Sequence, residues 1–158
     1  MEPRLKRLNS MHAAYVHSSS ATPEEDAAAK IMAYAQAQGL ISKKGARLFG
    51  RNTYPTDKPE PHGYEFYLTT ENAPKAGGDI KAGEIPGGLY AVLRFRDLTS
   101  IGSAWKKLWT WIEKSGIEHV GWRKEEHGWV GGFEEQVNWQ EMKPPNEWVF
   151  DLWVKLKE

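Results

Sequence analysis

The sequence consists of two similar halves, and this internal repeat restricts the possible folds more than any other feature. An offset of 77 residues relates matching positions in the two halves: Ala14 and Ala91, Ala27 and Ala104, Tyr34 and Trp111, Gly39 and Gly116, Leu40 and Ile117. Each half begins with a β-rich stretch that is followed by a helical pattern. We therefore expect one domain over residues 1–158 with two structural repeats, at about 11–70 and 85–156.

The first helix is bounded by recognisable end signals. Thr22 is placed to cap it, Pro23 suits the first helical position, and Glu25 completes a capping box. Alanines and long side chains favour helix up to about Gln38, and Gly39 suits the left-handed terminating position.

The second helix has the strongest periodic pattern in the chain. Its apolar residues recur at spacings of three and four: Ile101, Ala104, Leu108, Trp111 and Ile112. The pattern lies between a cap at Asp97 or Thr99 and a terminator at Gly116. We expect Trp111 to be buried beneath this helix, with Tyr34 in the equivalent place of the first repeat.

Five stretches are typical of β-strands because they are rich in aromatic and β-branched residues. They are residues 13–17, 64–68, 89–95, 133–137 and 148–156. Residues 132–137 match residues 63–68 at an offset of 69. The pattern predicts an α+β fold in which two pseudo-symmetric strand-helix-strand-strand repeats form one antiparallel sheet, with two helices on one face and a ligand groove on the other.

Charge and composition exclude several classes of function. The 21 Lys and Arg balance 21 Asp and Glu, so the field that attracts nucleic acid or an anionic membrane is absent. Cysteine is absent, and the five histidines lack the spacing of a metal site. No stretch approaches the roughly 20 apolar residues that cross a bilayer. We expect a cytoplasmic protein without metal or cofactor, and with neither nucleic acid nor membrane as a direct partner; the oligomeric state stays open.

Four pieces of the sequence, in their order and spacing, resemble the GyrI-like small-molecule-binding domain, also known as the effector-binding domain of multidrug-sensing transcription regulators. They are the turn and strand at 85–92, the helix at 104–116, the strand at 133–138 and the closing strand at 149–154. The resemblance covers nearly the whole chain and implies a small-molecule ligand. The sequence lacks the helix-turn-helix segment of the regulators and resembles a stand-alone member.

The resemblance also implies a glutamate in the floor of the ligand groove. In the family the third piece usually reads apolar-Glu-x-Tyr, and its glutamate meets cationic or electrophilic ligands. The matching residue here is Glu134, and Gln136 replaces the tyrosine. The first half keeps the Glu-x-Tyr pattern, as Glu65 and Tyr67.

The alternation of this strand predicts which side chains share a face. Glu134 and Gln136 lie on one face, whereas Phe133 and Val137 lie on the other. Because Phe133 and Val137 are apolar, we expect them to pack against the helices and Glu134 to face the groove. Glu135 then lies at an edge or in solvent. The alternative is that Glu134 only pairs with a lysine or caps the sheet, since a buried carboxylate needs a partner.

The eight tryptophans are the most unusual feature of the composition. Trp105 and Trp111 lie in the helical stripe, and we expect them in the core. The others of interest lie at a helix flank, in loops or on the non-core face of a strand: Trp109, Trp122, Trp129, Trp139 and Trp153. Some of these are expected to line the groove, and a packed second layer or a dimer contact is the alternative. Tyr90 is a further candidate lining residue.

Two functions are compatible with these residues. The first is binding of a hydrophobic, planar or cationic small molecule between aromatic walls, with Glu134 as the counter-charge. The second is implied by the resemblance, because some stand-alone relatives hydrolyse cyclopropane-bearing genotoxic natural products. In that case Glu134 is the catalytic candidate, as a general base on water, and Glu65, Tyr67 or Tyr90 meets the leaving atom. The sequence leaves open whether the protein turns a substrate over or only binds it.

Overall fold

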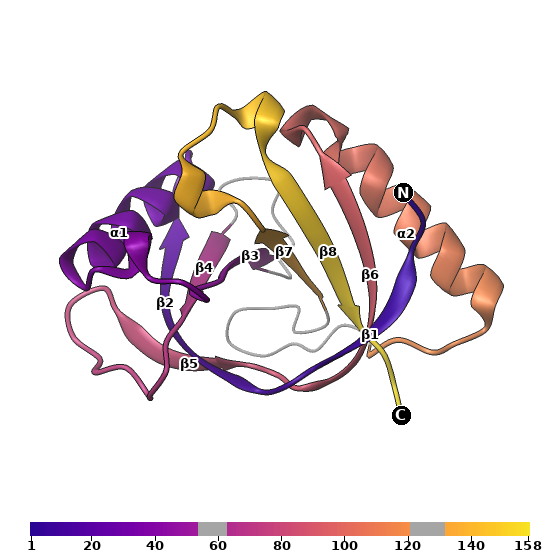
Figure 1. Ribbon diagram of the computed structural model, residues 1–158, viewed down its shortest axis with the longest axis horizontal. Helices are drawn as coiled ribbons and strands as arrows, with labels where there is room; N and C mark the ends of the chain where they lie inside the picture. The colour runs from indigo at the N-terminus through magenta and orange to yellow at the C-terminus, as the bar shows by residue number, and fades with distance from the viewer. Residues whose placement is uncertain (54–62, 121–131) are drawn as a thin grey trace.

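The computed structural model describes residues 1–53, 63–120 and 132–158, and in these residues the chain forms an eight-stranded antiparallel sheet with two α-helices (Figure 1). The strands are β1 (Arg4–Leu8), β2 (Met11–Ser19), β3 (Leu48–Thr53), β4 (Gly63–Thr69), β5 (Lys81–Ile85), β6 (Gly88–Arg96), β7 (Gly132–Gln136) and β8 (Val149–Lys155). The helices are α1 (Pro23–Ala37) and α2 (Ile101–Ser115).

The element order repeats along the chain and the sheet reflects this repeat. Each repeat runs strand, helix, strand, strand, as β2-α1-β3-β4 and as β6-α2-β7-β8. The strand order in the sheet is β1-β6-β8-β7-β3-β4-β2-β5, so β7 and β3 adjoin at the centre while β1 and β5 form the edges. This arrangement confirms the predicted α+β fold with two pseudo-symmetric repeats in one antiparallel sheet.

The two helices bury corresponding positions. The buried residues Ala27, Ile31 and Ala35 of α1 match Ala104, Leu108 and Ile112 of α2 at the offset of 77. Gly39 and Gly116 follow the two helices with φ angles of 68° and 72°, in the left-handed region that glycine adopts readily. Tyr34 and Trp111 occupy equivalent places, but both are only half-buried, so the expectation of a buried Trp111 is wrong.

The predicted capping box of α1 does not form. Thr22 is the N-cap residue, but its side chain makes no capping hydrogen bond to the backbone. The Thr22 hydroxyl instead donates to Asp26, which also accepts from Ser20. Before α2, the Asp97 side chain accepts from the backbone N–H of Thr99 and so begins the short 3-10 turn η2 (Leu98–Ser100).

The centre of the sheet corrects the correspondence between the two halves. The match of residues 132–137 to residues 63–68 is wrong, because β7 takes the place of β3 in the second repeat and β8 takes that of β4. The strand registers relate β3 to β7 at an offset of 84, which makes Gly50 the counterpart of Glu134. Gly50 and Glu134 are also direct partners between β3 and β7, so the pseudo-twofold axis passes through this pair.

The registers relate β4 to β8 at an offset of 86, and similar contacts recur at related positions. His17 of β2 lies with its Nδ1 atom 3.2 Å from Glu65 Oε2 on β4. The corresponding residues of the second repeat, Arg94 and Asp151, form a two-bond ion pair with both N···O distances at 2.9 Å. The repeat is therefore visible in its polar contacts as well as in its topology.

Both faces of the sheet carry a hydrophobic core. On the helix face, α1 packs around Ile31 and Leu68, and α2 packs around Leu108 and Leu152. On the opposite face one cluster takes residues from all eight described strands: Leu8, Ala13, Phe49, Tyr67, Ile85, Tyr90, Val92, Phe133 and Trp153. A flat sheet of eight strands would hold its edges about 34 Å apart. The sheet is instead curled around this opposite face, as Figure 1 shows.

Three of the described strands have no clear signal in the sequence, namely β1, β3 and β5. The β1 and β5 sequences are rich in charged residues, which are common on edge strands because they discourage pairing with other chains. Among the described residues, neither helix combines the length and the apolar character needed to span a membrane.

Candidate functional site

A cavity of about 770 Å³ lies on the helix face, between α1 and the start of α2. We call it the interhelical cavity. Its floor consists of residues from β3, β4, β7 and β8: Leu48, Asn52, Tyr64, Phe66, Glu134, Gln136 and Phe150. Its walls are contributed by α1, by the segment that begins α2, and by the connection between β7 and β8: Glu24, Glu25, Ala28, Ile31, Met32, Leu98, Ile101, Trp139, Met142, Lys143 and Trp148. The volume is in the range of small-molecule sites.

Glu134 is held in the floor of this cavity by two donors from different elements. The Tyr64 hydroxyl of β4 donates to Glu134 Oε1 at 2.8 Å. The Trp105 indole Nε1–H of α2 donates to Glu134 Oε2 at 2.8 Å. Each carboxylate oxygen has more than one lone-pair site, so the two bonds fix the orientation of the carboxylate without using its whole accepting capacity.

The same surroundings shift the pKa values of Glu134 and Tyr64. Burial raises the pKa of Glu134 above its ordinary value, and repulsion by Glu24 adds to the rise, while the hydrogen bonds from Trp105 and Tyr64 lower it. The pKa of Tyr64 is raised well above its ordinary value, by burial first and then by the Glu134 charge. Tyr64 therefore stays a hydroxyl donor at neutral pH.

The expectation that Glu134 faces away from the helices is wrong. Its partner Trp105 belongs to α2, and the cavity that contains Glu134 lies on the helix face. Phe133, which was assigned to the helix side, packs instead in the core of the opposite face. Val137 lies beyond the end of β7 and is 37% exposed.

Glu135 was expected at an edge or in solvent, but it is only 5% exposed. It accepts two hydrogen bonds from the Arg47 guanidinium, at 2.8 and 2.9 Å, and one from the Trp153 indole at 3.0 Å. The Arg47 guanidinium also lies over the rings of Phe49 and Trp153. Glu135 is thus part of an ion pair that stabilises the opposite face, and it lies away from the interhelical cavity.

Three of the predicted site residues meet in the interhelical cavity: Glu134, Gln136 and Trp139. Trp139 is 3% exposed, and its indole donates to the Ala46 carbonyl at 3.0 Å, which fixes the ring against the core of the first repeat. Gln136 is the counterpart of Asn52 at the offset of 84, and both amides line the cavity. The pseudo-twofold axis therefore relates two amide side chains in the floor.

Four other predicted site residues lie on the opposite face, in the curl of the sheet: Glu65, Tyr67, Tyr90 and Trp153. Glu65 is fully buried and accepts from Arg51 Nε at 3.0 Å and from the Tyr67 hydroxyl at 2.9 Å. The Tyr90 hydroxyl donates to the Pro86 carbonyl at 2.6 Å. These side chains make their contacts on the opposite face and do not line the interhelical cavity with Glu134.

Trp109 lies on α2 one turn beyond Trp105, with the two indoles stacked at 6.4 Å between ring centres. Its ring also meets His119 edge-on at 4.9 Å. Trp109 therefore contacts Trp105, which donates to Glu134, and is not itself a lining residue of the interhelical cavity. Trp122 and Trp129 lie outside the described residues.

Tyr64, Trp105 and Trp148 were missed as site residues by sequence reasoning. Trp105 was assigned to the core because it lies in the apolar stripe of its helix, yet its polar edge reaches Glu134. Tyr64 and Phe66 share the helix face of β4. Their spacing of two residues identifies Tyr64 as a site residue only when the face of β4 that lines the cavity is assigned correctly. Trp148 precedes β8, and its indole donates to the Lys143 carbonyl at 2.7 Å, which closes the connection over the cavity.

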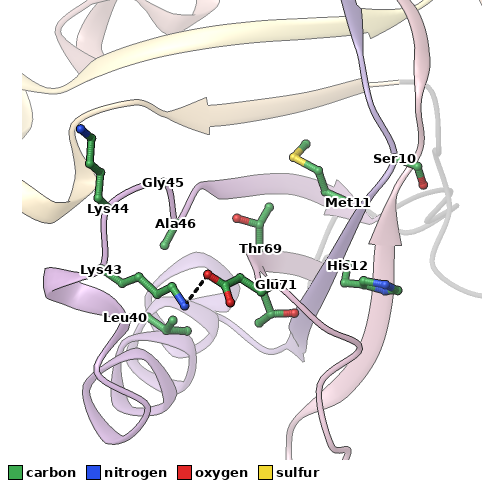
Figure 2. A pocket seen from close by; sticks show the side chains of 11 residues that line it. Ser10, Met11, His12, Leu40, Lys43, Lys44, Gly45, Ala46, Thr69 and Glu71 are labelled. Carbon is green, nitrogen blue, oxygen red and sulfur yellow. Dashed lines mark ion pairs between the residues drawn. The ribbon is translucent and has the colours of Figure 1, made fainter.

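A second cavity, of about 400 Å³, lies on the first repeat beside the start of β2 and the segment before β3 (Figure 2). Lys43 points toward Glu71 there, with a Nζ–Oε1 distance of 2.9 Å. Of the predicted site residues that the structure describes, none lines this cavity. Within the described residues, no cluster of His, Asp or Glu is suited to hold a metal ion.

Solved structures of similar fold cover almost the whole chain. The C-terminal domain of EcmrR aligns with a TM-score of 0.71 at 15% identity over 99% of this chain and 98% of that domain. In the EcmrR–DNA complex the chain spans about 57% of the longer EcmrR chain. SAV2435 bound to tetraphenylphosphonium aligns with a TM-score of 0.56 at 12% identity, over 99% of this chain and 94% of that one.

A hydrolase from Listeria innocua aligns with a TM-score of 0.64 at 8% identity, over 99% of this chain and 92% of that one. At these identities the structures show a shared fold. No curated protein sequence matches the chain. The sequence profile of the GyrI-like small molecule binding domain, however, matches residues 1–157. On the evidence of that match and of the repeated fold, the chain belongs to the GyrI-like small-molecule-binding family.

Proposed function

We propose that this protein binds a hydrophobic organic cation in the interhelical cavity, with Glu134 as its counter-charge. The observation that carries the proposal is the position of Glu134, whose carboxylate lies in the floor of a cavity of about 770 Å³ with aromatic side chains around it. A cation that enters places an opposite charge beside this buried carboxylate, which offsets the cost of its burial.

The composition of the cavity supports a cationic and aromatic ligand. Among the described residues that line it, three are acidic, namely Glu24, Glu25 and Glu134, and one, Lys143, is basic. Tyr64, Phe66, Phe150, Trp139 and Trp148 supply ring faces and edges, and each cation-π contact contributes about 0.5 to 2 kcal/mol. Met32 and Met142 add flexible side chains that adapt to ligands of different shape.

The structural neighbour SAV2435, bound to tetraphenylphosphonium, indicates a suitable probe. We expect tetraphenylphosphonium to bind the wild-type protein in isothermal titration calorimetry and to quench tryptophan fluorescence. Triphenylphosphine oxide, which is aromatic but neutral, should bind more weakly. Glu134→Gln keeps the shape and removes the charge, so it should weaken cation binding by about 1 to 3 kcal/mol, or roughly 5- to 150-fold.

The matched control is Glu113→Gln, which removes one charge from the exposed surface of α2 and should leave the affinity unchanged. Equal loss in both variants would mean that only the net charge of the protein matters. Equal affinity of wild type and Glu134→Gln for tetraphenylphosphonium would rule out Glu134 as the counter-charge.

Hydrolysis of a strained electrophile, such as a cyclopropane-bearing genotoxic compound, is a second candidate function. The observation that favours it is the 2.8 Å contact between the Tyr64 hydroxyl and Glu134. A carboxylate with a raised pKa is a better base for water, and the Tyr64 hydroxyl, which donates its one O–H to Glu134, holds that base in a fixed orientation.

The two functions are distinguished by single-turnover hydrolysis of a neutral cyclopropane-bearing substrate. If Glu134 activates water, Glu134→Gln should slow hydrolysis by about 100-fold or more with little change in substrate affinity. Tyr64→Phe should slow it to a lesser degree. Absence of turnover by the wild-type protein, together with tight cation binding, would leave binding as the function.

A further inference from the structure

Gly50 lies beneath the ring of Tyr64, in the central strand β3. A Cβ atom added at Gly50 would lie 2.9 Å from both Cε1 and Cζ of Tyr64, and closer still to the hydroxyl oxygen. The φ angle of Gly50 is not positive, so the backbone conformation there does not call for glycine. The requirement at this position is for space.

That space is what allows Tyr64 to reach Glu134. Tyr64 belongs to β4 and Glu134 to β7, and β3 lies between these strands, so the two strands are about 9.6 Å apart. Gly50 is paired with Phe66 of β4 on one side and with Glu134 of β7 on the other. The phenol ring of Tyr64 crosses β3 at Gly50, where the strand has no side chain to block it.

We propose that Gly50 is a positioning residue: its missing side chain lets the Tyr64 hydroxyl reach Glu134 and so favours the charged form of this carboxylate for a cationic ligand. The inference deepens the proposed function and rests on it for the ligand. The hydrogen bond from Tyr64 stabilises the ionised form of Glu134, because a donor to a carboxylate favours its charge. A methyl group at position 50 must displace the ring and weaken this bond.

Other charged groups near Glu134 also influence its ionisation and are the same in the wild-type protein and in the Gly50 variant. Of the titratable residues that line the same cavity, Glu24 and Glu25 belong to α1, and Lys143 belongs to the connection before β8. The α2 residue that faces Glu134 is Trp105, which does not titrate. The three atoms nearest to a Cβ at Gly50 all belong to Tyr64, so a Gly50→Ala change acts first on Tyr64.

The experiment compares Gly50→Ala, Tyr64→Phe and the double variant. The titration of the Glu134 carboxyl carbon is followed by carbon-13 NMR, with the signal assigned by its loss in Glu134→Gln. We expect the titration midpoint to move upward in both single variants. In the double variant it should move no further than in Tyr64→Phe, because the hydroxyl through which Gly50 acts is already gone. The pH midpoint of tetraphenylphosphonium binding should move in the same direction.

Gly77→Ala is the control, since a Cβ atom there meets no atom within 4 Å. An unchanged Glu134 titration in Gly50→Ala would overturn the proposal, and so would an additive shift in the double variant. Should Gly50→Ala fail to fold, the variant that also carries Tyr64→Leu removes the obstructing ring, and its failure to fold too would overturn the role of Tyr64. The NMR titration needs no ligand, so it tests the positioning role of Gly50 separately from ligand binding. If the titration shifts are as expected but the wild-type protein does not bind tetraphenylphosphonium, the proposed function is refuted and the positioning role of Gly50 stands.

Discussion

The Tyr64 hydroxyl donates to Glu134 across 70 positions of sequence, and the bond joins the two repeats of the chain. Tyr64 comes from the first repeat and Glu134 from the second, while Trp105 supplies the other donor to the carboxylate. The floor of the cavity is therefore assembled only when both repeats are folded against each other.

Trp105→Phe should weaken cation binding at neutral pH while keeping the aromatic ring. The indole N–H is a donor to Glu134 Oε2, and its hydrogen bond lowers the pKa of Glu134. Without it the pKa rises, so the carboxylate is protonated at higher pH and the midpoint of binding moves upward. We expect about a 3- to 10-fold loss of affinity for tetraphenylphosphonium near neutral pH. Calorimetry over a range of pH measures both effects, and an unchanged midpoint contradicts the assignment.

Glu134→Gln should make the protein more stable, and more so at pH 7.5 than at pH 4. Folding raises the pKa of Glu134, mainly through burial, so the folded protein binds this proton more tightly than the unfolded chain does. The contribution of Glu134 to the free energy of unfolding therefore falls as the pH rises through that range. Urea unfolding of both proteins at the two pH values tests the sign, with Glu113→Gln as the reference. A larger gain at pH 4 would reverse the argument.

Glu135→Gln should affect stability and leave ligand binding unchanged. The carboxylate of Glu135 accepts two bonds from Arg47 and one from Trp153, on the face of the sheet away from the cavity. Because Arg47 is partly exposed, we expect a loss of about 1.5 to 3 kcal/mol, the range for hydrogen bonds to charged groups. Chemical denaturation gives this value, and calorimetry with tetraphenylphosphonium should show wild-type affinity. A large loss of affinity would place Glu135 in the site instead.

Ile31→Ala and Leu108→Ala should destabilise the protein to a similar degree. The two residues are counterparts at the offset of 77, and they are 1% and 0% exposed beneath α1 and α2. Each truncation should lower the free energy of unfolding by about 2 to 5 kcal/mol. Because the residues belong to separate clusters, the two losses should add in the double variant. Trp111→Ala, at a half-buried position, should cost less than Leu108→Ala.

The sequence was sufficient for the repeated architecture because that information is local. The period of the helices, the terminating glycines Gly39 and Gly116, and the spacing of 77 residues each depend on neighbouring residues. Glu134 was found through the family resemblance, and the structure places it in a cavity. These features need no knowledge of how distant segments meet.

The face of β7 could not be predicted correctly from its alternation. Alternation separates an apolar face from a polar one, but here both faces of the curled sheet are packed. Phe133 belongs to the core inside the curl, so its apolar character did not indicate which face of β7 packs against the helices. Tyr64 was missed for a related reason, since its contact with Glu134 depends on the empty position at Gly50 in a strand between them.

The pairing of Gly50 with Glu134 across the pseudo-twofold axis limits how similar the two repeats can become. If the first repeat also carried a glutamate here, two carboxylates would stand on one face with their Cβ atoms about 5 Å apart, where like charges repel. One of the two would then take up a proton, as in paired acids that share a site. In this chain the counterpart of Glu134 is Gly50, so one carboxylate stands alone on the axis and the two repeats differ at their shared centre.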